Sequence, residues 1–253
     1  MLQPDPHCPL CGGKGYIAGP GADAACPCIM GNSSPAGNDS LAGIPERYRQ
    51  RSFANFSLTT IDQRRVLKMV KDYVDQFRFH GPAIEASELT QQPVDISAEK
   101  NSLLLTGDVG TGKTHLAVAA LREIMAKGHT GLYWNVSELF RAIRAGFQED
   151  EGDSDILEDC AAVDVLLLDD LGTHRNTDFV IDRLYTIVNR RYDTMRPIIA
   201  TTNLGLTELF EDFDKRIASR LFEMSFHVQC LGGDYRLSAV ERQRGAGRKS
   251  SHA

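Results

Sequence analysis

The chain lacks any long apolar run. No stretch of its 253 residues reaches the roughly 18 consecutive apolar residues from which a membrane-spanning helix is built. Its first residues, Met-Leu-Gln-Pro-Asp-Pro, also lack the basic and then apolar order of a secretory signal peptide. These two absences argue against a membrane protein and against a secreted one, and we expect a cytoplasmic protein.

Positive charge is also in short supply. Lysine and arginine total 28 against 34 aspartate and glutamate residues, which leaves a formal net charge of −6. This balance argues against a protein that wraps nucleic acid over its whole surface, but it leaves room for a local basic path. The composition therefore excludes bulk packaging of nucleic acid rather than nucleic-acid binding as such.

Cysteine is scarce, and four of the six cysteines gather near the start of the chain: Cys8, Cys11, Cys26 and Cys28. In a cytosolic protein such a set favours metal binding over disulfides. Two cysteine pairs brought together by a glycine-rich loop predict a tetrahedral Zn²⁺ site, with His7 as a possible substitute ligand. The alternatives are an unstructured tail and a redox Cys-x-x-Cys motif. The redox motif normally opens a helix, which Gly12 and Gly13 disfavour.

Composition divides the chain into four parts. Residues 1–30 hold the cysteine pairs, and residues 31–43 form a linker rich in glycine, serine and asparagine. Residues 44–236 alternate between apolar strand-like runs and helical patterns. Residues 237–253 are basic and contain glycine, so we expect them to be disordered.

Residues 107–114 read Gly-Asp-Val-Gly-Thr-Gly-Lys-Thr and fit the phosphate-binding P-loop. An apolar run over residues 102–106 predicts a strand before it, and an Ala/Leu-rich run over residues 115–127 predicts a helix after it. We expect Lys113 to reach the β- and γ-phosphates of ATP and the Thr114 hydroxyl to bind Mg²⁺. The predicted nucleotide contacts are Gly107, Asp108, Val109, Gly110, Thr111, Gly112, Lys113, Thr114 and His115.

Two further strands end in polar side chains. The run over residues 163–169 leads into Asp169 and Asp170, which is the Walker B pattern. Asp169 is expected to hold Mg²⁺, and Asp170 to polarise the attacking water. Many ATPases of this type have glutamate at the second position, so the shorter aspartate weakens the prediction of a base. Asn203 ends a strand expected over residues 196–203 and can orient the same water.

The remaining patterns complete an α/β fold. Helices are expected over residues 62–80, 138–145, 178–192 and 214–221, and strands over residues 130–136 and 225–231. Ser137 is the expected N-cap of the helix that follows it. Because strands and helices alternate, we predict three layers, with a parallel five-stranded sheet between helices.

Together these segments resemble the AAA+ ATPases of the DnaC/DnaI helicase-loader and IstB transposition-helper group. The matching segments occur in the family's order: residues 44–48 with Phe53 and Phe56, then 107–114, 168–172, 198–203, 216–220 and 234–236. The resemblance covers about residues 44–236. It implies an AAA+ core without the separate helical lid of most AAA+ proteins, because the residues after Arg236 are too few to form one.

The same resemblance implies roles for individual residues. Asn203 corresponds to sensor 1, Arg220 to the arginine finger and Arg236 to a candidate sensor 2. Arg141 and Arg144 lie where related ATPases grip single-stranded DNA, and the alternative is an ordinary solvated helix face. The cysteine module looks similar to zinc-binding N-terminal parts of some DnaI-type and phage loaders, which dock on the replicative helicase.

The resemblance implies an ATP-dependent helicase loader in the initiation of DNA replication. Such a protein binds ATP and single-stranded DNA, contacts a replicative DNA helicase and self-associates into a ring or spiral. The nearest alternative is an IstB-like helper that acts with a transposase on duplex DNA. A nucleotide-dependent adaptor that does not hydrolyse ATP is a second alternative, because of Asp170. A small-molecule kinase is weaker, because Arg220 suits hydrolysis between subunits.

Arg220 bears on how the ATP site is completed. Lys113 is the only cation that the sequence places on the P-loop face, and hydrolysis needs positive charge opposite the γ-phosphate. Arg220 lies on a short helix after residues 196–203, and in AAA+ folds this helix faces the neighbouring subunit. We therefore expect Arg220 to act in trans. The alternative is a pair with a nearby carboxylate such as Glu211 or Glu223.

Overall fold

A computed structural model describes most of the chain between residues 42 and 235. The described residues are 16–17, 24–25, 42–77, 100–148, 154–172, 178–233 and 235. Cys8, Cys11, Cys26, Cys28, His7 and Arg236 therefore lie outside the described residues. Near the start of the chain, β1 (Tyr16–Ile17) pairs with β2 (Ala24–Ala25) in an antiparallel arrangement.

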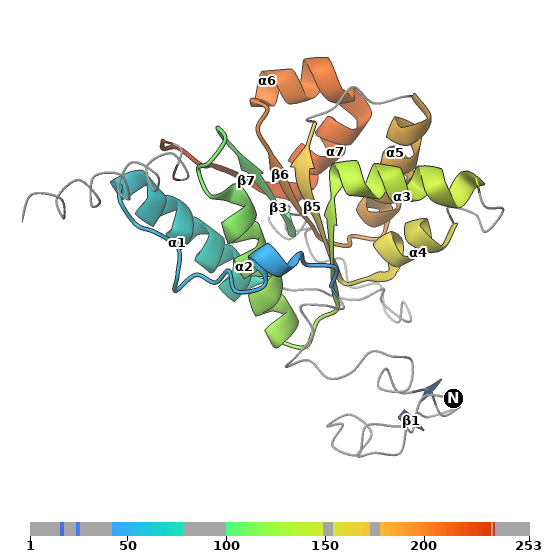
Figure 1. Ribbon diagram of the computed structural model, residues 1–253, viewed down its shortest axis with the longest axis horizontal. Coiled ribbons are helices and arrows are strands. Elements are labelled where there is room, and N and C mark those ends of the chain that lie inside the picture. Colours follow the sequence, from blue (N-terminus) through green and yellow to red (C-terminus); the bar gives the residue numbers. More distant parts are fainter. Residues whose placement is uncertain are drawn as a thin grey trace, which may run out of the picture.

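Five parallel strands form the central sheet, as predicted. They are β3 (Ser102–Thr106), β4 (Gly131–Asn135), β5 (Val165–Leu171), β6 (Ile198–Thr202) and β7 (Ser225–Gln229), in the order β4-β5-β6-β3-β7. Every neighbouring pair is parallel. The P-loop strand β3 and the Walker B strand β5 therefore flank β6, so that the three carboxyl ends meet at one edge of the sheet (Figure 1).

Helices cover both faces of this sheet (Figure 1). α1 (Ile61–Gln76) and α2 (Lys113–Ala126) pack on one face, and α3 (Val136–Gln148), α4 (Ser154–Ala162), α5 (Asp178–Asp193) and α7 (Lys215–Met224) pack on the other. Side chains alternate along β3: Leu103 and Leu105 join the first core and Leu104 the second. This arrangement confirms the predicted three layers.

Short helical segments complete the described part of the chain. The 3₁₀ helix η2 (Glu46–Tyr48) precedes α1, and α6 (Leu206–Glu208) with the π-helix η4 (Leu209–Phe213) connects β6 to α7. None of the described helices is long and apolar enough to cross a membrane.

Several helix boundaries differ from the predictions, and two of these differences have a local cause. α1 ends at Gln76 rather than at residue 80, because Phe77 leaves the helical conformation with a ψ of 123°. α3 begins at Val136, directly after β4, and the side chain of Asn135 accepts a hydrogen bond from the Ser137 N–H at 3.1 Å. Asn135 therefore caps this helix, and the prediction that Ser137 is the N-cap is wrong.

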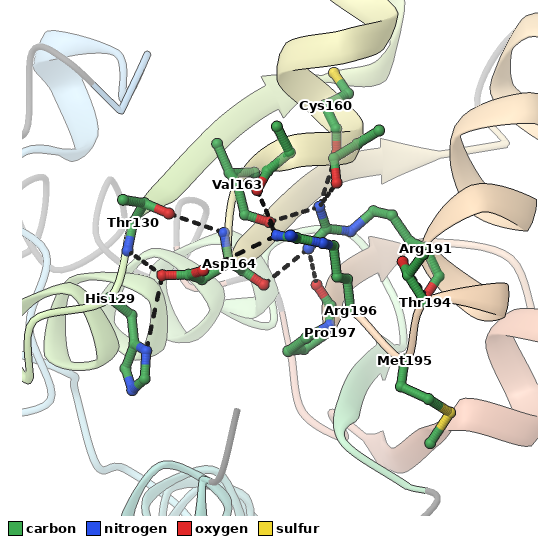
Figure 2. Close-up of polar contacts among 12 residues, drawn as sticks. His129, Thr130, Cys160, Val163, Asp164, Arg191, Thr194, Met195, Arg196 and Pro197 are labelled. Atoms are coloured by element: carbon green, nitrogen blue, oxygen red, sulfur yellow. Dashed lines mark hydrogen bonds and ion pairs between the residues drawn. The ribbon is translucent and has the colours of Figure 1, made fainter. Parts of the chain in front are cut away.

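A fully buried arginine ties together the amino ends of β5 and β6 (Figure 2). The guanidinium of Arg191 donates to five backbone carbonyls, those of Cys160, Ala161, Val163, Asp164 and Pro197, at 2.7–3.5 Å. Arg196 lies beside it and donates to the carbonyls of Ala162 and Val163. These arginines hold the turn before β5 against the start of β6, at the end of the sheet opposite the P-loop.

Candidate nucleotide-binding site

The P-loop joins β3 to α2 and curls around its own lysine. The ammonium of Lys113 donates to the carbonyls of Gly107 at 2.6 Å and Asp108 at 2.7 Å. Gly107 has a φ of +136°, and a Cβ there would lie 2.2 Å from the Cys230 carbonyl oxygen. Only glycine fits this position, where the loop passes directly against the segment that follows β7.

The first turn of α2 packs against the segment before α1. Gly112, the N-cap of α2, has a φ of +95°, and a Cβ there would lie 2.7 Å from the Phe56 ring. The His115 imidazole lies edge-on to the same ring, with centroids 5.2 Å apart, and its Nε2 is 2.9 Å from the Ser52 carbonyl oxygen. Burial lowers the pKa of His115. His115 therefore anchors residues 52–56 beside the loop.

Asp169, on β5, is buried at 3% exposure and is held by three hydroxyl groups. Its Oδ1 accepts from Thr114 at 2.9 Å and from Thr201 at 2.7 Å, and its Oδ2 accepts from Tyr133 at 2.9 Å. Burial raises the pKa of this carboxyl, while the three hydroxyl donors act in the opposite direction. The hydrogen bond between Thr114 and Asp169 brings together a hydroxyl and a carboxylate. Both are oxygen ligands of the kind that Mg²⁺ prefers.

Asp170 occupies an irregularity in the ladder between β5 and β6, where the register shifts between Leu168 and Leu171. Its φ is +65°, which is rare for a residue other than glycine. The Asp170 N–H donates to the Thr201 hydroxyl at 2.9 Å, and its Oδ1 accepts from the Asn203 amide at 3.0 Å. The bulge thus turns the Asp170 carboxylate toward Asn203, as a pair of polar groups that can orient water.

Residues of the P-loop, of α2 and of the ends of β5 and β6 line one cavity of about 810 Å³. Among the predicted site residues, its lining contains Val109, Gly110, Thr111, Gly112, Lys113, Thr114, His115, Asp169, Asp170 and Asn203. Gly107 and Asp108 contact Lys113 from the base of the loop. The structure therefore brings together the predicted P-loop, Walker B and strand-end residues at the carboxyl edge of the sheet.

One wall of the cavity comes from a segment that the sequence did not assign to the site. Its residues are Arg47, Tyr48, Arg51, Asn55, Phe56, Ser57 and Gln63. The expectation that Lys113 is the only cation on this face is therefore wrong, because Arg47 and Arg51 line the same cavity. The one indication in the sequence that this segment is functional was the motif of residues 44–48, which resembles the family's. That motif does not predict which residues the segment contacts. Thr201 and Tyr133 were also missed.

Arg220 is not among the residues that line this cavity. Its Nε donates to the Asn189 side-chain oxygen at 2.9 Å, and its guanidinium lies 4.9 Å from the centre of the Tyr185 ring. Glu223 instead accepts from the Tyr192 hydroxyl. The described contacts of Arg220 are thus with the Asn189 amide, the Arg216 carbonyl and the rings of Tyr185 and Tyr192, rather than with the carboxylates considered as its alternative partners.

Of the remaining predicted residues, the structure describes Arg141 and Arg144 but not Arg236. Arg236 lies outside the described residues, but its neighbour Tyr235 lines the cavity and donates its N–H to the Gly110 carbonyl at 3.1 Å. Arg141 and Arg144 are exposed on α3, and Arg141 lies 3.8 Å from Glu138. The position of Tyr235 holds the chain against the P-loop immediately before Arg236.

The four cysteines predicted to bind zinc lie outside the described residues. Within the described part of the chain, no group of three or more histidine, cysteine, aspartate or glutamate side chains is arranged to hold a metal ion. Cys160 and Cys230 are buried free thiols. Burial raises the pKa of Cys160 to about 12 and that of Cys230 to about 11, which disfavours the reactive thiolate.

Comparison with known proteins identifies a family. The model of the family described as IstB-like ATP binding protein matches residues 49–242, well over half of the chain. The protein YdaV of Escherichia coli (strain K12) is 26% identical over 180 residues, which cover 71% of this chain and 65% of YdaV. The replicative helicase loader DnaC of the same organism is 24% identical over 181 residues, which cover 71% of this chain and 66% of DnaC.

The similarity extends to three dimensions. A crystal structure of the DnaC helicase loader superposes with a TM-score of 0.61 at 26% identity, covering 74% of this chain and 100% of that one. The matches to YdaV and DnaC span slightly less than two thirds of each relative's length. The family model, over residues 49–242, spans the P-loop and all five strands of the central sheet.

Proposed function

The chain belongs to the IstB-like ATP binding protein family, and from this premise we propose that it is an ATPase that acts as a loader of a replicative DNA helicase. The observation that carries the ATPase proposal is the convergence of Lys113, Thr114, Asp169, Asp170 and Asn203 on one cavity. The similarity to DnaC supports the loader role. The substrate would be ATP, converted with water to ADP and phosphate.

Each residue has a distinct task in this proposal. The Lys113 ammonium leaves the carbonyls of its own loop to bind the β- and γ-phosphates, and the loop N–H groups bind the remaining phosphate oxygens. Thr114 and Asp169 would hold Mg²⁺, which supplies positive charge to the phosphates when bound. Asn203 and Asp170, already hydrogen-bonded to each other, orient the attacking water, and Asp170 accepts its proton.

The test of the ATPase is Lys113→Ala, measured as nucleotide affinity and as phosphate release. We expect both to fall by at least about tenfold, because the charge opposite the phosphates is lost. Lys127→Ala is the matched control, since Lys127 ends the same helix and donates to the Val74 carbonyl, away from the cavity. Wild-type turnover by Lys113→Ala would refute the site. ATP binding without turnover in the wild type would instead favour the non-hydrolysing adaptor.

The partners of this loader would be a replicative DNA helicase and single-stranded DNA. The second candidate is an IstB-like transposition helper, and the description of the matching family favours it. A pull-down from the native host, scored for replicative helicase against transposase, separates the two. Replacing Arg141 and Arg144 together by alanine should weaken binding of single-stranded oligonucleotides, if these exposed arginines contact the phosphates.

Arg220 would complete the site of a neighbouring subunit in a ring or spiral. In support, Arg220 lies outside the cavity of its own chain, on α7. Arg220→Ala should bind ATP without hydrolysing it, and mixing it with Lys113→Ala should restore part of the activity. In such mixtures, some interfaces place Arg220 of the Lys113→Ala subunit against the intact P-loop of the Arg220→Ala subunit. Normal hydrolysis by Arg220→Ala would instead favour Arg47 or Arg51 as the second cation within the same chain.

Residues 1–30 would form a zinc module joined through residues 31–43 to the ATPase unit of residues 44–236. The antiparallel pairing of β1 with β2 supports this proposal, because both strands lie in the sequence between the two cysteine pairs. We expect one Zn²⁺ per chain, lost when Cys8, Cys11, Cys26 or Cys28 becomes serine. Elemental analysis of a reduced preparation that finds no zinc would exclude the module.

A further inference from the structure

Tyr133 reaches the Walker B carboxylate from the neighbouring strand. It lies in the middle of β4 with 3% of its surface exposed, and it pairs with Leu167 of β5. Asp169 lies two residues further along β5, on the same face, so that the two side chains are diagonal neighbours within reach of an aromatic ring. The phenol donates to Asp169 Oδ2 at 2.9 Å, and this hydrogen bond is buried.

The main chain of Tyr133 is fixed on its other side as well. Its N–H donates to the Ala42 carbonyl at 2.6 Å, and both Ala42 and Ile44 are buried. Gly43 passes so close that a Cβ there would lie 2.9 Å from the Tyr133 carbonyl oxygen. The edge strand β4 is thus held between β5 and residues 42–44, and the ring has little freedom to leave Asp169.

The three hydroxyl groups around Asp169 do not all bind the same oxygen of its carboxylate. Oδ1 accepts from Thr114 and Thr201, whereas Oδ2 accepts from Tyr133. Thr114 and Thr201 line the cavity, but Tyr133 is not among its lining residues. The hydrogen bond from Tyr133 to Oδ2 opposes rotation of the carboxylate and favours the orientation in which Oδ1 faces Thr114, the other residue assigned to Mg²⁺.

We propose that Tyr133 is a positioning residue that orients the Asp169 carboxylate for the metal–nucleotide complex. This inference rests on the proposed ATPase function and assigns to it a residue outside the nucleotide cavity. A purely structural reading is that the phenol only compensates for the burial of a carboxylate. The two readings differ in what removal of the hydroxyl does to metal binding in a protein that remains folded.

The test compares Tyr133→Phe with Tyr73→Phe. Tyr73, on α1, is also buried at 6% exposure, and its phenol donates to the Asn101 carbonyl at 2.9 Å, away from the nucleotide cavity. Both variants lose one buried hydroxyl and keep the ring. Thermal melting confirms that each is folded. The probes are a fluorescent ADP analogue, titrated without divalent metal, and Mn²⁺, whose binding to the ADP-loaded protein is followed by electron paramagnetic resonance.

We expect Tyr133→Phe to weaken Mn²⁺ binding roughly tenfold, as removal of an outer-shell partner does at metal sites. Its affinity for the nucleotide without metal should match the wild type, and kcat should fall more than KM rises. Tyr73→Phe should change only the melting temperature. In an Asp169→Asn background, Tyr133→Phe should have little further effect on Mn²⁺, because the group it orients is gone.

Wild-type Mn²⁺ affinity in Tyr133→Phe would overturn the positioning role while leaving the ATPase proposal intact. An equal loss in Tyr73→Phe would also overturn it, because the effect would then follow stability alone. By contrast, failure of the wild-type protein to bind the ADP analogue would refute the proposed function itself. The metal-free titration therefore separates the two failures.

Discussion

Asp169 at the carboxyl end of the parallel sheet and Arg191 at its amino end are both buried, but their charges are satisfied in different ways. At the carboxyl end, Asp169 is 3% exposed and accepts from three side-chain hydroxyls. At the amino end, Arg191 is fully buried and donates to five backbone carbonyls. Both charges have partners, and the difference lies in whether those partners can rearrange.

The hydroxyls of Thr114 and Thr201 can rotate toward a new partner, whereas the carbonyls around Arg191 are fixed by the backbone. Asp169 also borders a cavity of about 810 Å³, and Arg191 is not among the residues that line it. A buried charge with rotatable partners beside a cavity is suited to receive a ligand. A buried charge held by carbonyls stabilises the fold instead. The comparison thus separates a candidate site from a structural ion, although both are buried to a similar degree.

The largest expected effect is on stability at the amino end. Arg191→Met should lower the free energy of unfolding by about 4 kcal/mol, because five backbone carbonyls lose the hydrogen bonds that the guanidinium donates and methionine has no donor to replace it. Urea denaturation measures the change. Arg190→Met is the matched control: Arg190 precedes it on α5 and is exposed, so the change should stay within about 0.5 kcal/mol. Equal stability of the two variants would contradict the structural role of Arg191.

The second effect is on activity at the carboxyl end. Asp169→Asn should lower Mg²⁺-dependent phosphate release by about 100-fold and leave the fold stable, since the amide oxygen still accepts from a hydroxyl and the amide NH₂ can donate to a hydroxyl oxygen. Asp164→Asn makes the same substitution next to the other end of β5, where Asp164 accepts from the Thr130 N–H at 2.8 Å. It should release phosphate at the wild-type rate. An equal loss of activity in both variants would contradict the assignment of the nucleotide site to the carboxyl end of the sheet alone.

The smallest expected effect is on kcat, and it comes from comparing two neighbouring threonines of β6. Thr201→Val removes the hydroxyl that joins Asp169 to the Asp170 N–H, and we expect roughly a tenfold fall in kcat. Thr202→Val removes a neighbouring buried hydroxyl that bonds the Leu171 carbonyl and the Leu204 N–H instead. Both should lose about 1–3 kcal/mol of stability. Steady-state kinetics at saturating ATP should show the loss of kcat in Thr201→Val alone.

Sequence patterns predicted the parts of the site that follow local rules. The glycine spacing of residues 107–114, the apolar run before it and the helical run after it together specify a phosphate-binding turn at a helix start. The carboxylates at the end of β5 and the amide after β6 were predicted in the same way, from apolar runs that end in polar residues. Each of these patterns is a short run of consecutive residues, in which chain geometry alone decides what is adjacent.

Contacts between segments distant in sequence required the tertiary structure. Tyr133 reads as an apolar strand residue, and only the pairing of β4 with β5 places its phenol on Asp169. Arg191 reads as part of a basic helix end, yet it is fully buried, because the turn before β5 and the start of β6 meet over it. Arg47 and Arg51 line the cavity of the P-loop, and residues 52–56, which follow them, pack on α2. Strand order and helix packing decide these neighbours, since burial and hydrogen-bond satisfaction are set over the whole domain and not within any one segment.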